Sequence, residues 1–212
     1  MIRFLASTAL AIGLSASPAL AERSAAQTLA LSAELYLEGV ERQDPLLLLA
    51  AAKLRKSVVM SRVERVPDSD MAPPDDAEAV EPIGWQEILD AAVAMAPEDE
   101  ILAGLAEDVR AENARGVKSG QVYSITSIRH GGTDTYPALT YRAGEYADVY
   151  VEGSGEADLN LYVYDTQDRL VCSDTAISAI AHCGWTPSTE AGFVIVVRNK
   201  GRGSSGYSLI TN

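Results

Sequence analysis

Basic residues, histidine, cysteine and long apolar runs are all scarce in this chain, and each shortage excludes a class of function. Seventeen lysines and arginines stand against 30 aspartates and glutamates, which gives a formal net charge of -13. Without a basic patch to neutralise phosphate, nucleic acid is excluded as a partner. Beyond the N-terminal stretch, no apolar run approaches the roughly 18 residues that a membrane span needs, so we predict no transmembrane segment.

The usual catalytic motifs are missing as well. The sequence has no Gly-x-Ser-x-Gly elbow, no His-Glu-x-x-His and no Walker loop. The two histidines, His130 and His182, each lack the further ligands that a zinc site needs. Residues Gly201 to Gly206 match Gly-x-Gly-x-x-Gly, but they precede a terminal strand and not a helix, so we interpret them as a hairpin turn. We predict no catalytic residue, although paired acids that meet only in the folded protein remain open.

The first 21 residues have the pattern of a secretory signal peptide. Arg3 supplies a positive start, Phe4 to Leu14 is apolar, and Ala19 to Ala21 forms a small-x-small cleavage site. We therefore expect cleavage after Ala21 and a mature protein that is periplasmic or secreted.

Two cysteines, Cys172 and Cys183, are present, and both lie in the second half of the chain. An even pair in an exported protein predicts a disulfide bond. A metal-binding pair or a reactive thiol are weaker alternatives, because the spacing is not Cys-x-x-Cys and His182 is the one other soft ligand nearby.

Residues 22–118 have helical periodicity and predict a small domain of four helices. Gly39 lies near the end of the first helix, where a neighbouring helix can approach closely. The Pro-rich and acidic stretch 66–82 predicts a mobile loop without regular structure, either a plain connector or a tether for a cation or partner. The predicted helices are Ser24–Arg42, Pro45–Arg62, Trp85–Ala96 and a fourth from Pro97 to about Gly116.

After Lys118 the pattern changes to short β-rich runs separated by glycine, proline, aspartate and asparagine. Eight runs at this spacing predict an antiparallel β-sandwich, most simply a jelly roll, over residues 119–212. The fold class is therefore α+β and multidomain, with the helical domain followed by the sandwich. The predicted strands are Val122–Ile128, Ala138–Arg142, Ala147–Glu152, Leu159–Tyr164, Arg169–Cys172, Ala179–Cys183, Phe193–Arg198 and Tyr207–Thr211.

Five segments in this half, taken in order, resemble the bacterial pre-peptidase C-terminal domain family. They are Ala157–Asp165, Leu170–Asp174, Cys183–Pro187, Gly192–Gly201 and Gly206–Asn212. The resemblance implies a small non-catalytic β-sandwich, appended to exported proteases and other exported proteins and linked with substrate attachment, secretion or folding. Some members of that family bind calcium. No protease domain accompanies the module here, so a role in presenting a protease to its substrate does not follow.

Four aspartates, Asp158, Asp165, Asp168 and Asp174, are candidate calcium ligands, because calcium takes six to eight oxygens and turns supply both carboxylates and carbonyls. The alternative is that these side chains only form turns and cap strands. Within the strand Leu159–Tyr164, aliphatic and polar or aromatic residues alternate, which places Tyr162 and Tyr164 on one face. These two tyrosines are candidate binding residues, with ordinary cross-strand pairing as the alternative.

The function predicted from these features is that of an exported, non-catalytic binding or scaffold protein, in which the sandwich is an attachment module for a protein or an envelope polymer. The alternative is an enzyme, or an accessory subunit of an exported hydrolase, that acts on envelope polymers. Calcium is the one cofactor for which the sequence offers candidate ligands.

Overall fold

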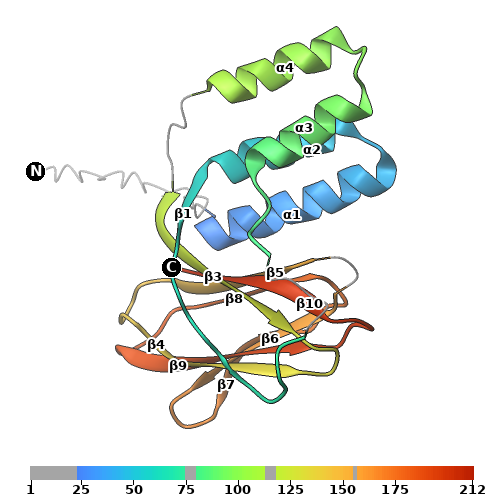
Figure 1. The fold of residues 1–212 in the computed structure, drawn as a ribbon. Coiled ribbons are helices and arrows are strands. Elements are labelled where there is room, and N and C mark those ends of the chain that lie inside the picture. Colours follow the sequence, from blue (N-terminus) through green and yellow to red (C-terminus); the bar gives the residue numbers. More distant parts are fainter. Residues whose placement is uncertain (1–22, 75–79, 113–117, 155–156) are drawn as a thin grey trace, which may run out of the picture.

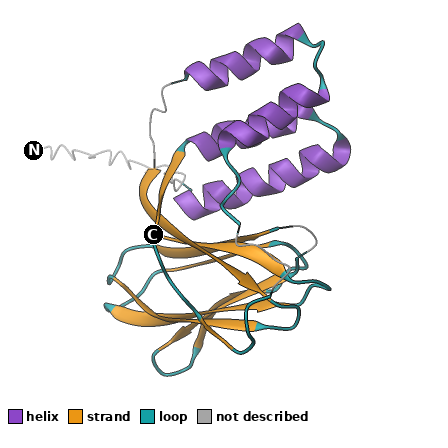
Figure 2. Cartoon of the chain, viewed as in Figure 1, coloured by secondary structure: helices purple, strands orange, loops and turns teal. Residues whose placement is uncertain are grey.

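The computed structural model describes residues 23–74, 80–112, 118–154 and 157–212. The predicted signal peptide, residues 75–79 of the acidic loop and the predicted helix end at Gly116 lie outside the described residues. In the part that is described, four helices are stacked on one side of a sandwich of two five-stranded sheets (Figures 1 and 2). The predicted fold class is therefore confirmed.

Local capping signals set the starts of three helices. Ser24 and Gln27 form a capping box at the start of α1. Asp44 accepts hydrogen bonds from the first-turn amides of α2, and Asp99 does the same for α4, so the fourth helix begins after Asp99 and not at Pro97. Among the described residues, no helix combines the length and apolar character that crossing a bilayer requires. The helices are α1 (Ala25–Arg42), α2 (Pro45–Lys56), α3 (Trp85–Met95) and α4 (Glu100–Ala111).

All eight predicted strands of the second half are present. They are β3 (Lys118–Ile128), β4 (Thr133–Tyr141), β5 (Ala147–Gly153), β6 (Leu159–Asp165), β7 (Leu170–Asp174), β8 (Ile180–Trp185), β9 (Ala191–Asn199) and β10 (Ser205–Thr211). Their order is β3-β10-β5-β8 in one sheet, here sheet A, and β4-β9-β6-β7 in the other, sheet B, with antiparallel neighbours throughout. This order is that of a jelly roll, as predicted.

The first half of the chain also contributes a strand to each sheet, which the sequence analysis did not predict. The second helix ends at Lys56 and not at Arg62, and Val58–Arg62 forms β1, which pairs parallel with β3. Within the acidic loop, Asp68–Ser69 forms β2, which pairs antiparallel with β4. The prediction that residues 66–82 contain no regular element was therefore wrong at this point.

These additions explain how the sandwich protects its edges. An unpaired edge strand offers free amides and carbonyls to other chains. On one side of the sandwich, β1 covers the edge of β3 and β2 covers the edge of β4. On the opposite side, where β8 and β7 are the last strands, side chains take two of the β8 amides: Ser178 Oγ accepts from Ile180 N, and Asp174 Oδ2 accepts from His182 N.

Apolar burial joins the two layers. The sandwich interior is closed at one end by Trp185, whose ring meets Tyr141 edge to face at a centroid distance of 5.0 Å. Trp185 is therefore a core residue. Outside the sandwich, Leu29 of α1 packs with Tyr150 and Ile210 on the outer face of sheet A. Helix α1 thus covers sheet A, whereas sheet B lies on the side away from the helices (Figure 1).

Candidate binding surfaces

The outer face of sheet B carries a stacked pair of tyrosines on β6. In β6, Leu161 and Val163 are fully buried in the sandwich, so the intervening Tyr162 and Tyr164 point outward, as their alternation predicts. Their ring centroids lie 6.4 Å apart with an interplanar angle of 19°. The Arg198 guanidinium, from the neighbouring strand β9, lies 5.1 Å from the Tyr162 centroid, within the range of a cation–π contact.

Two polar groups beside this stack lack hydrogen-bond partners among the described residues. Asn160 of β6 pairs in register with Arg198 of β9. The Asn160 Oδ1 and the Arg198 Nε are both buried and have no hydrogen-bond partner in the described part of the chain, and Asn160 as a whole is only 9% exposed. Burying a polar atom without a partner costs about 1–3 kcal/mol, so a bound water that supplied the missing hydrogen bond would stabilise the fold at each atom. Neither residue could be identified from the sequence, because their proximity depends on the pairing of residues 38 positions apart.

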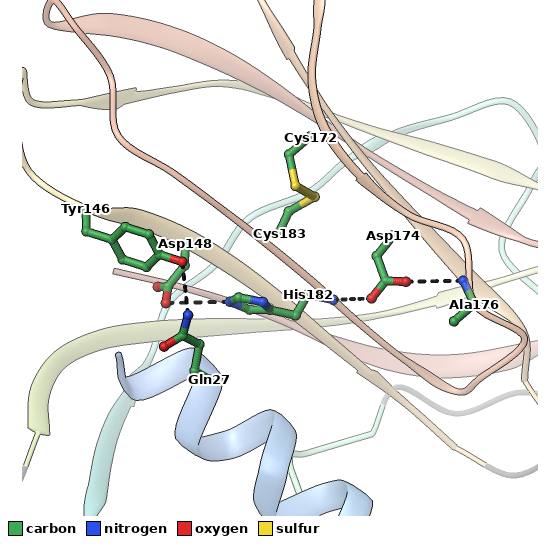
Figure 3. Close-up of a disulfide and its surroundings, with 8 residues drawn as sticks. All are labelled: Gln27, Tyr146, Asp148, Cys172, Asp174, Ala176, His182 and Cys183. Carbon is green, nitrogen blue, oxygen red and sulfur yellow. Dashed lines mark hydrogen bonds and ion pairs between the residues drawn. A yellow bond between two sulfur atoms is a disulfide. The ribbon is translucent and has the colours of Figure 1, made fainter. Parts of the chain in front are cut away.

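The predicted disulfide between Cys172 and Cys183 is present, with the two Cα atoms 5.8 Å apart (Figure 3). Cys172 belongs to β7 at the edge of sheet B, and Cys183 belongs to β8 at the edge of sheet A. The bond therefore joins the two sheets at an edge where no strand pairing connects them.

The four candidate calcium ligands do not come together at one place. Asp165 and Asp168 share the β6–β7 turn, Asp158 precedes β6 at its opposite end, and Asp174 ends β7. Among the described residues, no three His, Cys, Asp or Glu side chains are grouped as they would need to be to hold a metal ion. Calcium binding stays a prediction, which titration of the protein with calcium tests.

Two of these aspartates have clear local roles. The amides of Arg169 and Gln167 donate to Asp165 Oδ1, and these bonds, with the first the stronger, hold the pKa of the Asp165 carboxyl below its usual value. Asp174 accepts from the amides of Ala176 and His182, at 3.1 and 2.9 Å (Figure 3). These contacts favour the alternative interpretation, in which the carboxylates shape turns and edges.

Both histidines contact other parts of the sandwich. His130 Nδ1 forms a hydrogen bond with the carbonyl oxygen of Gly201. His182 Nε2 lies 3.7 Å from Asp148 Oδ2, an ion pair when the imidazole is protonated. Asp148 is 1% exposed, and neither of its carboxylate oxygens has a hydrogen-bond partner among the described residues. Figure 3 shows Tyr146 and Gln27 of α1 beside this pair, with Gln27 Nε2 donating to the Tyr146 hydroxyl at 3.2 Å.

A buried ion pair connects the helical layer to sheet A. Arg55 of α2 donates to Glu152 of β5 at 2.8 Å, and the Tyr150 hydroxyl and the Ile83 amide donate to the same carboxylate. Burial raises the pKa of Tyr150 well above its usual value, so the hydroxyl stays a donor. Nothing local in the sequence marks this pairing, because Arg55 and Glu152 lie 97 positions apart.

No family model matches the chain, and no curated protein matches it. Solved structures similar to it include the periplasmic inhibitor of g-type lysozyme from Aeromonas hydrophila, with 14% identity, a TM-score of 0.34, and 43% of this chain and 84% of that chain covered. A pre-peptidase C-terminal domain of a Bacillus anthracis collagenase has 13% identity, a TM-score of 0.34, and coverage of 41% and 86%. The C-terminal carbohydrate-binding module of a Zobellia galactanivorans laminarinase has 8% identity, a TM-score of 0.28, and coverage of 40% and 76%.

These likenesses carry no inference about binding or activity. The jelly-roll architecture rests on the strand order of this chain. Membership of the pre-peptidase C-terminal family stays a prediction.

Proposed function

We propose that the protein is an exported, non-catalytic binding protein that attaches to a polysaccharide-containing envelope polymer through the outer face of sheet B. The observation that carries this proposal is the Tyr162–Tyr164 stack with Asn160 and Arg198 beside it. This arrangement offers stacked aromatic surface with a guanidinium beside it. A sugar polymer has the complementary chemistry, with apolar C–H faces and hydroxyl groups on the same ring.

The asymmetry of the two sheets supports this choice of surface. The outer face of sheet A is occupied by α1, which buries Tyr150 and Ile210. Tyrosine presents a large amphipathic surface with few rotatable bonds, so little side-chain entropy is lost when a ligand covers it. Sheet B therefore offers a rigid aromatic surface on the side of the sandwich away from the helices.

Export is supported by the disulfide between Cys172 and Cys183, because disulfides persist in oxidising compartments. The signal-peptide pattern of residues 1–21 is consistent with the same compartment.

Co-sedimentation with insoluble peptidoglycan and with insoluble cellulose tests the proposal. We expect the native protein to bind at least one polymer, and the Tyr162→Ala/Tyr164→Ala variant to bind at least about tenfold more weakly, as expected for the loss of aromatic anchors. Tyr146→Ala is the control, because it removes a tyrosine that is 42% exposed and directly precedes β5 of sheet A. Thermal unfolding of each variant shows whether the sandwich remains folded.

Equal binding by the native protein and the double variant would contradict the proposal, as would the absence of sedimentation with either polymer. Release of soluble sugars during the assay would favour the alternative, a hydrolase acting on envelope polymers.

A further inference from the structure

A cleft separates α1 from the edge of the sandwich. Its larger part has a volume of about 460 Å³ and lies between α1 and the strand β8. A second part of about 300 Å³ continues along α1 toward the segment 80–83 and the end of β5. Leu37 and Ile180 line both parts, so the two hollows adjoin along one side of the helix.

The floor of this cleft is apolar and its rim is acidic. Glu34, Glu38 and Glu41 follow one another at spacings of four and three residues, which places them on one face of α1, and all three line the larger part. Asp174 faces them from the end of β7. Neither part of the cleft is lined by a lysine or an arginine of the described residues.

Arg42 compensates part of this negative charge. It pairs with Glu38 at 2.6 Å and also interacts electrostatically with Glu41. Glu34 and Glu41 form no ion pair within 4.0 Å in the part of the chain that the structure describes. Two unpaired carboxylates above an apolar floor produce a negative potential that a cationic group entering the cleft would relieve.

Two large apolar side chains are exposed at or beside the cleft. Leu37, which lines both parts, is 47% exposed. Ile177 is 92% exposed, between the cleft residues Ala176 and Ser178 in the β7–β8 connection. A partner that covered both residues would gain the free energy of burying their apolar surface.

We infer that this cleft is a docking site for a basic, amphipathic segment of a partner protein. Lysine and arginine can lay their apolar stems against Leu37 and Ile180 and direct their charged ends to Glu34 and Glu41. Docking proceeds through side chains and not by addition of a strand to β8, because Ser178 and Asp174 already take two of its edge amides. This surface is separate from the aromatic face of sheet B, which lies across the sandwich.

The test measures binding of three synthetic peptides of equal length to the full mature protein by fluorescence anisotropy. One peptide alternates lysine with leucine, the second alternates lysine with serine, and the third alternates glutamate with leucine. We expect the lysine–leucine peptide to bind most tightly, in a 1:1 ratio, and to weaken as salt is added. The glutamate–leucine peptide should not bind.

Two variants of equal charge separate the cleft from the general acidity of the protein. Glu34→Gln/Glu41→Gln should lower the affinity for the lysine–leucine peptide by about fivefold, which is the effect expected for the loss of two exposed ion pairs. Glu98→Gln/Glu100→Gln removes the same charge at the exposed start of α4 and should change the affinity by less than about twofold. Leu37→Ser should lower the affinity for the lysine–leucine peptide and leave the affinity for the lysine–serine peptide unchanged.

Equal losses of affinity for the lysine–leucine peptide in the two double variants would overturn the inference. They would show that the peptide is attracted by net charge alone. Equal affinity for the lysine–leucine and lysine–serine peptides would overturn it as well, because the apolar floor would then contribute nothing. A failure of polymer binding by sheet B leaves this test unaffected, since the substituted residues lie on opposite sides of the sandwich.

Discussion

Arg55 and Glu152 lie 97 residues apart in the chain and form an ion pair of 2.8 Å in which the two side chains are only 2% and 11% exposed. The pair joins α2 to β5 and therefore holds the helical layer on the sandwich. Arg55 Nε and Nη2 have no hydrogen-bond partner among the described residues. The positive charge of the buried guanidinium is thus balanced by Glu152.

Removing one member of this pair should be strongly destabilising. Glu152→Gln leaves the Arg55 charge buried without a counter-charge, which typically costs about 3–5 kcal/mol. We expect a loss of this size in the free energy of unfolding measured by urea denaturation. Arg55→Met/Glu152→Gln should recover part of the loss, because neither residue is then charged.

An exposed pair on the same helix is the control for that experiment. Lys53 of α2 lies 3.1 Å from Glu112, with both side chains about half exposed. Glu112→Gln should change the free energy of unfolding by less than about 1 kcal/mol. A similar loss in the free energy of unfolding for Glu112→Gln and Glu152→Gln would show that burial does not strengthen the contribution of the Arg55–Glu152 pair to stability.

Reduction of the disulfide should destabilise the sandwich. Cys172 and Cys183 are 11 residues apart, and cross-linking a loop of this length stabilises by roughly 2–3 kcal/mol in the chain-entropy model. We expect the midpoint of urea unfolding to fall when reductant is added to the native protein. Cys172→Ala/Cys183→Ala should resemble the reduced protein and show no response to reductant. A native protein whose midpoint is unchanged by reductant would disprove a stabilising role.

Strands of the second half could be predicted because their signals are local. In β6 the alternation of Leu161 and Val163 with Tyr162 and Tyr164 defines both the strand and its faces within a few residues. The turn residues between runs then define eight strands, whose number alone suggests a jelly roll.

The strand β1 could not be predicted in the same way, because its conformation depends on a distant partner. Val58–Arg62 directly follows α2, and it becomes a strand by pairing with β3, about 60 residues later. The β-branched Val58 and Val59 were the available local signal. In the candidate site, Tyr162 was predictable from its own strand, whereas Arg198 reaches it only through the register of β6 and β9.

A buried carboxylate in sheet B should make stability depend on pH in a defined direction. Asp134 of β4 is 1% exposed, and the hydroxyls of Ser69 and Tyr207 donate to it at 2.5 and 2.7 Å. Desolvation raises the pKa of Asp134 above its usual value of 3.8 despite these two bonds. The folded state therefore binds this proton more tightly than the unfolded state does.

The sign follows from that difference. The stabilisation from protonated Asp134 is complete below pH 3.8 and is lost as the pH rises through the raised pKa. Asp134→Asn removes the titration, so the stability of the native protein relative to this variant should increase as the pH falls from 7 toward 4. Urea denaturation of both proteins across this range measures the difference. A difference that does not vary with pH would contradict the raised pKa.

Two helical glycines should respond to alanine in opposite directions. Gly39 is buried where α1 and α2 meet, as its position predicted, and a Cβ there would collide with the Leu48 side chain and lie 3.1 Å from the Asp44 carbonyl oxygen. Leu48 is fully buried and has little room to move, so Gly39→Ala should lower the free energy of unfolding by about 1–3 kcal/mol.

Gly104 in α4 has no atom within 4 Å of an added Cβ. Gly104→Ala should therefore stabilise by about 0.5–1 kcal/mol, because alanine restricts the unfolded chain and favours the helix. Thermal unfolding of the two variants measures both effects, and a stabilising Gly39→Ala would show that the two helices do not approach this closely.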